Sequence, residues 1–434
     1  MSHTSTTPKQ QWRVEQLAYC SNVHPGASLN KVSENIIDFL NQVRLGRQNK
    51  TMASGLWLSN LAAQTFTEYQ QPQQQFIESL KTSAIKLTSL NGFPYGDFHQ
   101  KVVKQKVYLP SWDEKARLDY SIQLADILAK NLDDDLAHTV STTNNKQISY
   151  GAISTLPLGY ANDWSELKTE QAADNLITLA LYLSELENRT NKRIIFGIEM
   201  EPDCALESTE QMVSFFVHKL LPKAEQKGHQ PALILRYIGC CFDTCHQAVM
   251  YENIQDSLSK ITQAGITICK IQLSNAVAAN LSSTEQITAL CQRFNDKKFL
   301  HQCKLYSPLL GHVAVADMNK DSLVAILMKH QSLATDLTPL TCHVHYHVPI
   351  NISIFDKVKL SNEFNICTTQ TSILETLDFL AENPQLNPYL EIETYTWLQL
   401  LTQDKTNKSA LIDGLIAEFS WLEMQLQQRN LLTS

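Results

Sequence analysis

Short apolar runs alternate along this chain with longer segments in which apolar residues recur at helical spacing. This alternation is typical of βα units on a parallel sheet. The runs that predict strands are residues 17–23, 55–59, 84–90, 148–155, 193–199, 238–243, 267–273, 341–348 and 389–393. The pattern predicts an α/β fold, a (β/α)8 TIM barrel with one surplus strand. It leaves open whether residues 341–348 or 389–393 form the eighth barrel strand.

Helical spacing is clearest over residues 29–44, and it predicts further helices at 115–132, 170–187, 210–225, 372–382 and 410–427. Three βα loops exceed the needs of a minimal barrel, namely 91–112, 131–147 and 274–340. Loops of this length are usually functional, and we expect the first and third to cover the barrel mouth. We predict one elaborated domain over residues 1–434, with a disordered tail at 1–14.

The composition is that of a soluble protein with a sizeable core, since 43 % of residues are hydrophobic and 18 % are charged. A net charge of −8 disfavours nucleic acid as a partner. Lysines gather only at Lys101, Lys104 and Lys106, where they could meet an anionic ligand or form a solvated face. Ten cysteines without a CxxC pair, and no apolar run of spanning length, predict a cytoplasmic protein without membrane insertion.

Several predicted strands end in a carboxylate or are followed by an imidazole. Glu199, Asp243 and Glu393 stand at or next to three strand ends, and His246 follows Asp243. Because a barrel brings the carboxyl ends of its strands around one mouth, these groups predict a single divalent-metal site. Asp243 could instead cap a helix, and the glutamates could pair with Arg193 or Arg236.

Three histidines alternate at His343, His345 and His347, so in a strand they project to one face. They are either functional groups or satisfied core residues. Glu201 is expected to hold a metal ligand in place or to contact the substrate. Gln272 could offer the metal a weaker, neutral oxygen ligand. A last group consists of the aromatic residues Phe93, Tyr95, Phe98, Tyr108 and Trp112. It predicts either a wall for a bulky ligand or a small core under a long loop.

Two glutamates facing one metal suit the removal and return of a proton beside a carbonyl, which is isomerase or epimerase chemistry. Metal-assisted hydrolysis would use the same groups with a bound water. The chain has no GxSxG, Walker or GxGxxG motif, so serine nucleophiles, P-loop chemistry and dinucleotide binding lose their usual support. Cys245 beside His246 is a weak nucleophile candidate, because adjacent residues rarely orient toward each other.

The strand-end groups resemble those of the xylose isomerase-like TIM barrels. A narrower set of segments looks like the metabolite traffic protein EboE family: LAYCSNVHPG at 17–26, NGFPYGDFH at 91–99, VYLPSW at 107–112, STLPLG at 154–159, HVHYHVP at 343–349 and EIETYTW at 391–397. This resemblance implies a bacterial protein that helps to move or process a small metabolite precursor for export. It also implies a prenyltransferase-like membrane protein of the same operon as partner.

The superfamily resemblance implies metal ligands at Glu199, Asp243 and Glu393, with His246 on the ligand side. The usual fourth ligand is a histidine, where this chain has Gln272, and His345 or His347 could replace it. The ion would be Mn, Mg or Zn. An endonuclease-like role at abasic DNA, also implied, is disfavoured by the acidic charge. The alternative activity is a metal-dependent sugar isomerase or epimerase, and whether the protein is an enzyme stays open.

The sequence therefore yields three groups of candidate residues. The catalytic candidates are Glu199, Glu393 and His246. The metal-ligand candidates are Glu199, Asp243, Gln272, His345 and Glu393. The substrate-binding candidates are His24, Asn91, Tyr95, His99, Lys104, Glu201, His343 and His347.

Overall fold

The computed structural model describes residues 12–100, 103–142, 146–294, 298–333, 338–360, 363–400 and 407–433. Eight parallel strands form a ring in the order β2-β16-β9-β8-β7-β6-β4-β3. β2 pairs with β16, and a parallel bridge between Cys20 and Gly55 joins β2 to β3 and closes it. The TIM barrel is thus confirmed, with strands β2 (Ala18–Tyr19), β3 (Met52–Trp57), β4 (Ile85–Asn91), β6 (Gln147–Thr155), β7 (Arg193–Ile198), β8 (Ile238–Asp243), β9 (Ile268–Leu273) and β16 (Tyr389–Ile392).

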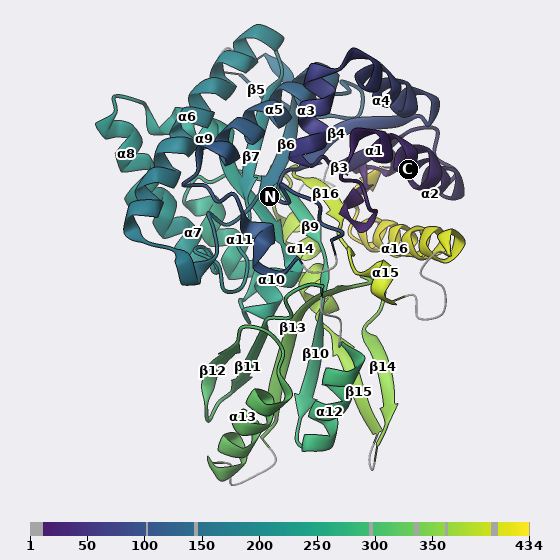
Figure 1. Cartoon of the computed structure of the whole chain (residues 1–434), viewed down its shortest axis with the longest axis vertical. Coiled ribbons are helices and arrows are strands. Elements are labelled where there is room, and N and C mark those ends of the chain that lie inside the picture. The colour runs from purple at the N-terminus through teal and green to yellow at the C-terminus, as the bar shows by residue number, and fades with distance from the viewer. Residues whose placement is uncertain are drawn as a thin grey trace, which may run out of the picture.

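Helices surround the barrel and cover the apolar outer faces of its strands (Figure 1). They are α1 (Leu29–Asn35), α2 (Asn41–Gly46), α3 (Asn60–Glu68), α4 (Gln70–Thr82), α5 (Lys115–Asn131), α6 (Glu166–Thr190), α7 (Thr209–Phe215), α8 (Leu221–Gln226), α9 (Pro231–Tyr237), α11 (Ile254–Gln263), α14 (Gln370–Glu382) and α16 (Lys408–Gln428). Two short helices, α10 (Thr244–Val249) and α15 (Trp397–Leu400), follow β8 and β16. None of the helices among the described residues is long and apolar enough to span a membrane.

A second, antiparallel sheet is inserted between β9 and α14, and Figure 1 shows it below the barrel. Residues 274–340, predicted as a loop, instead supply three of its strands and two helices. The prediction failed because only one face of these strands is apolar throughout, so they do not read as continuous apolar runs. The sheet has the order β12-β11-β13-β10-β15-β14, and its elements are β10 (Asn275–Leu281), α12 (Thr284–Arg293), β11 (Cys303–Ser307), β12 (Gly311–Val315), α13 (Lys320–Leu333), β13 (Leu340–Val348), β14 (Ile354–Lys359) and β15 (Glu363–Thr368).

This sheet accounts for the surplus strand. Residues 341–348 belong to β13 at the centre of the second sheet, and the eighth barrel strand is β16. Alternate side chains of β13, among them Val344 and Tyr346, enter a core that α12 and α13 complete. The three histidines of β13 therefore occupy its other face, which lies against α10.

The first and last described residues pair in a short two-stranded sheet. β1 (Trp12–Arg13) pairs with β17 (Leu432–Thr433), and the Trp12 side chain is fully buried. Residues 1–11 lie outside the described residues, but the predicted disordered tail is wrong for residues 12–14, because Trp12 packs into the core. Among its described residues, the segment 131–147, predicted as a loop, contains the strand β5 (His138–Ser141).

The barrel interior holds a buried ion pair between Lys270 and Glu391, 2.7 Å apart. Glu391 also accepts a hydrogen bond from Ser89, and the Lys270 ammonium lies 3.3 Å from the Ser154 hydroxyl. Gly55 makes room for the Glu391 carboxylate, because a Cβ at this position would overlap it. This polar layer lies inside the barrel, beneath the residues at its mouth.

Candidate metal centre

Asp243 ends β8, a strand buried along its whole length, and it begins α10. Its Oδ1 caps the helix by accepting from the backbone N–H of His246 at 3.1 Å, and it also accepts from the Ser274 hydroxyl at 2.6 Å. Its Oδ2 is buried without a hydrogen-bond partner. Helix capping therefore occupies one oxygen only, and the other remains available to a ligand.

Three imidazoles stand beside this carboxylate, and each has its Nδ1 hydrogen-bonded to a carbonyl oxygen. The partners are the Met200 carbonyl for His246 at 2.8 Å, the Gln302 side-chain carbonyl for His345 at 2.9 Å, and the Glu393 carbonyl for His347 at 2.9 Å. Because carbonyl oxygens only accept, each Nδ1 carries the proton and each Nε2 keeps a free lone pair. That is the tautomer that a metal-binding histidine needs.

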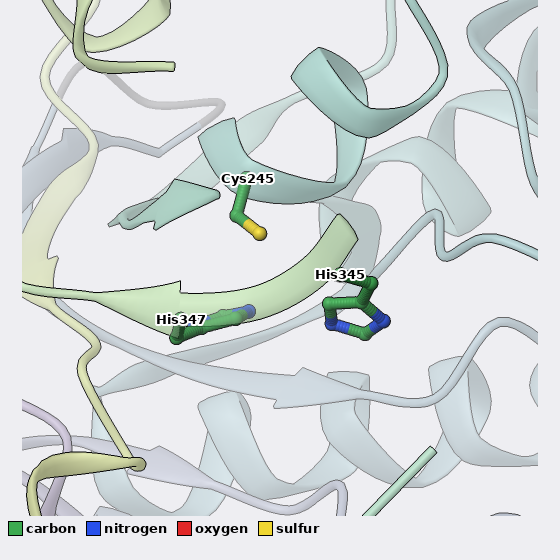
Figure 2. A group of neighbouring side chains, drawn as sticks. All are labelled: Cys245, His345 and His347. Atoms are coloured by element: carbon green, nitrogen blue, oxygen red, sulfur yellow. The ribbon is translucent and has the colours of Figure 1, made fainter. Parts of the chain in front are cut away.

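The ring of His246 lies 4.6 Å from that of His345 and 5.5 Å from that of His347. Figure 2 shows His345 and His347 on β13 and Cys245 on α10. Within each of three groups, the possible ligand atoms lie within 4.8 Å of one another. The groups are Asp243 with His246 and His347, Glu201 with His246 and His345, and Cys245 with His345 and His347.

Two glutamates after β7 and one after β16 complete the polar surroundings. Glu201 accepts from the Tyr108 hydroxyl at 2.8 Å through one oxygen, and Glu393 accepts from the Asn22 amide at 2.7 Å. One oxygen of Glu199 and the second oxygen of Glu201 are buried without a partner. The two orphaned oxygens lack hydrogen-bond donors, so a bound cation would satisfy them.

Burial and mutual repulsion change the pKa values of these groups. Burial first, and then the neighbouring carboxylates, raise the pKa of Glu199 and of Glu393. Burial raises the pKa of Glu201 to about 7 and lowers that of His347 to about 4. Burial alone would also raise the pKa of Asp243, but the adjacent imidazoles and the Ser274 hydroxyl lower it. At neutral pH this predicts an ionised Asp243 beside a neutral His347, which suits metal binding.

The donor set fits a divalent cation. Buried atoms without partners include Oδ2 of Asp243 and Nε2 of both His345 and His347, and the adjoining cavity of about 60 Å³ has room for an ion and a few waters. Imidazole nitrogens combined with carboxylate oxygens favour Zn or another transition ion over Mg, which prefers oxygen alone.

No family model and no curated protein matches this chain. Its fold is similar to solved TIM barrels. A xylose isomerase-like TIM barrel protein from Mycobacterium smegmatis in complex with magnesium has 7 % identity and a TM-score of 0.46, covering 94 % of this chain and 99 % of that one. A D-tagatose 3-epimerase-like protein has 11 % identity and a TM-score of 0.41, with 95 % and 98 % covered. The IOLI protein with a zinc atom has 13 % identity and a TM-score of 0.33, with 59 % and 72 % covered.

The five predicted metal ligands do not all lie at the same place in the structure. Asp243 and His345 belong to the groups of close ligand atoms, whereas Glu199 and Glu393 line the adjoining cavity. Gln272 does neither: its Oε1 accepts from the thiol of Cys241 at 3.0 Å inside the barrel. His246, predicted to be catalytic, belongs to two of the three groups.

The predicted substrate-binding residues divide into those at the cavity and those away from it. Lys104, Glu201 and His347 line the cavity. Asn91 and His99 stand behind it: the Asn91 amide is 3.4 Å from the Glu393 carboxylate, and His99 Nε2 is 2.7 Å from the Asn22 carbonyl. The remaining three pack elsewhere: His24 on Phe39, Tyr95 on Tyr120 and His343 on Tyr251.

Arg193 and Lys104 are paired with carboxylates outside the site, and burial affects the nearby Cys245 thiol. Arg193 pairs with Glu187 at 2.6 Å, so it does not neutralise Glu199. Lys104 pairs with Asp317, and Lys101 lies outside the described residues. Burial raises the pKa of the Cys245 thiol well above its ordinary value, which opposes a role as nucleophile.

Sequence reasoning missed several residues at the site. Asn22 and Tyr395 stand in segments that carry the family resemblance, and both line the cavity. Phe299 and Gln302 lie in the segment predicted as a loop and also line it. No local pattern marks Gln302, because its contact with His345 exists only once β13 crosses the barrel mouth.

Proposed function

We propose that this protein binds a divalent metal at the barrel mouth and uses it to bind or process a small metabolite, in the manner expected of an EboE-like metabolite traffic protein. The observation that carries the proposal is the set of buried ligand-type atoms without hydrogen-bond partners, on Glu199, Glu201, Asp243, His345 and His347. Buried polar atoms normally have partners, so their convergence beside one cavity calls for a ligand.

The residues that would hold the ion belong to two groups that share His246: Asp243 with His246 and His347, and Glu201 with His246 and His345, each with its possible ligand atoms within 4.8 Å of one another. A divalent cation there supplies Lewis-acid polarisation of a ligand oxygen. Glu199 and Glu393 line the same cavity, and burial raises the pKa of both, so each holds a proton to a higher pH than an exposed glutamate would and is placed to exchange it with a ligand. This placement supports a metal-dependent isomerase or epimerase reaction as the second candidate function.

Metal content of protein purified without a His tag tests the proposal. After dialysis against equimolar Mn, Mg and Zn, we expect mass spectrometry of the eluted metal to give a defined stoichiometry with Zn or Mn bound in preference to Mg. We expect His345→Gln and His347→Gln each to weaken metal binding by about tenfold or more.

His343→Gln is the matched control, since His343 lies on the same face of β13 and bonds the Ala248 carbonyl through Nδ1 at 2.7 Å. It belongs to none of the close ligand groups found among the described residues, so its substitution should leave metal content unchanged. If the His345→Gln, His347→Gln, Glu199→Gln and Asp243→Asn variants all hold as much metal as the unsubstituted protein, the proposed site is wrong.

Turnover of a candidate metabolite by the loaded protein would favour processing, and stoichiometric retention without conversion would favour carriage. Delivery to a prenyltransferase-like membrane partner is part of the same proposal. Co-purification of the two proteins from their native membrane fraction would test it.

A further inference from the structure

The cavity above the proposed metal site is polar at one end and apolar along the opposite wall. From this division we infer that its ligand is a neutral molecule with an oxygen-chelating end and an apolar body, not a polyhydroxy sugar. The inference rests on the proposed function and deepens it by naming the ligand class.

The polar end consists of groups that are already oriented. Glu201 receives the Tyr108 hydroxyl, Glu393 receives the Asn22 amide, and His345 donates to the Gln302 carbonyl. What these groups leave free are acceptor atoms, which suit a cation more than a second set of hydroxyl groups. The ligand atoms at this end are therefore those that bind the metal.

The opposite wall is built from aromatic and aliphatic side chains of segments that are distant in sequence. Phe98 and Val103 follow β4, while Phe299 precedes β11 of the inserted sheet and Tyr395 follows β16. The rings of Phe98 and Phe299 are 5.0 Å apart, and each lies within 5.5 Å of the Tyr395 ring. The Val103 N–H donates to the Lys298 carbonyl at 2.9 Å, which joins the segment after β4 to the insertion.

This wall disfavours a sugar. A sugar carries a hydroxyl on nearly every carbon, and a hydroxyl placed against Phe98, Val103 or Phe299 finds no side-chain partner there. Each such unpaired hydroxyl lowers affinity by about fivefold or more. An apolar body on the ligand instead gains from leaving water.

The lining of the cavity disfavours an anionic ligand. Lys104 is the one lysine or arginine that lines the cavity within the described part of the chain, and its ammonium is paired with Asp317. A phosphate or free carboxylate would therefore find no unpaired lysine or arginine among the described lining residues, which favours a chelating group without net negative charge.

Two small hydroxamates of nearly equal size provide a matched test. Propionohydroxamate and glycolohydroxamate are added as the neutral acids and share the same chelating end, which loses a proton when it binds a metal. One carries a methyl group where the other carries a hydroxyl. On tag-free protein loaded with Zn, we expect titration calorimetry to give about fivefold or more tighter binding of propionohydroxamate.

Variants of the wall should change this preference without changing metal content. Phe299→Ala opens the wall to water, and Val103→Thr adds a hydroxyl with little change in shape, so both should reduce the preference to about twofold or less. Tyr306→Ala is the control, because Tyr306 is 37 % exposed on β11 and does not line the cavity. It should leave the preference intact.

The outcomes are distinguishable. A protein that takes up no metal refutes the proposed function, and the ligand class that rests on it. A loaded protein that binds glycolohydroxamate as tightly as propionohydroxamate, or more tightly, refutes the ligand class alone. Loss of the preference in Tyr306→Ala as well would also refute the assignment of the wall.

Discussion

Breaking the ion pair inside the barrel should destabilise this protein more than most single substitutions. Both Lys270 and Glu391 are fully buried, and their charged atoms are 2.7 Å apart. We predict that Lys270→Met lowers the free energy of unfolding by about 3 to 5 kcal/mol, because it leaves a carboxylate buried without its cation. Glu391→Gln should cost somewhat less, because its amide oxygen can still accept from Ser89.

The magnitude follows from the balance of attraction and desolvation. With an effective dielectric constant of about 20, two unit charges at this distance attract by about 6 kcal/mol. The cost of removing both charges from water offsets much of that gain, so removing both partners is far less harmful than removing one. Lys270→Met combined with Glu391→Leu should therefore recover most of the stability lost in Lys270→Met.

Urea unfolding followed by circular dichroism measures these differences in free energy. Lys115→Met is a suitable control: Lys115 pairs with Asp119 at 2.6 Å, but on the surface, with side-chain exposures of 80 % and 51 %. It should cost less than about 1 kcal/mol. The reasoning fails if Lys270→Met costs no more than this control, or if the double variant is destabilised by the sum of the single effects.

Two further predictions concern the stability contributed by a buried histidine and a buried glycine. Burial lowers the pKa of His24 to about 3 from an ordinary 6.5, so the unfolded chain binds its proton first, and stability present above pH 6.5 is lost as the pH falls. Between pH 7 and pH 5 the wild-type protein should lose about 2 kcal/mol more than His24→Gln in urea titrations, and equal losses would contradict this. Gly55→Ala should lower the unfolding temperature, because its Cβ would overlap the Glu391 carboxylate, whereas Gly96→Ala has open space and should not.

The barrel could be predicted because its strands are buried on both faces and read as continuous apolar runs. The prediction for residues 238–243 coincides with β8, and the one for 193–199 exceeds β7 by one residue. The second sheet escaped because only one face of β10 and of β11 is apolar, and the core on that face is completed by α12 and α13, which follow β10 and β12 in sequence. Only β13, with its longer run, could be predicted as a strand.

The candidate site likewise contains residues that could be predicted from the sequence and residues that could not. Glu199, Asp243 and Glu393 could be selected from sequence, because each stands at or next to the end of a barrel strand, and strand ends meet at the mouth. The roles of His345 and His347 depended on knowing that β13 crosses that mouth. The orientation of His345 depends further on Gln302, and a contact between two inserted segments has no local signature.

The position of the insertion explains how the barrel assembles imidazoles at its mouth although β9 contributes Gln272 and no histidine. The inserted sheet begins directly after β9, where the Ser274 hydroxyl donates to the Asp243 carboxylate at 2.6 Å. The Thr244 hydroxyl donates to the Ser274 carbonyl at 2.6 Å, so the root of the insertion is fixed to the first turn of α10. A sheet anchored to the same carboxylate that faces His347 holds its own histidines in register with the barrel. The insertion therefore supplies ligand-type atoms to the site as well as covering it, and the two sheets must pack correctly before the group of close ligand atoms exists.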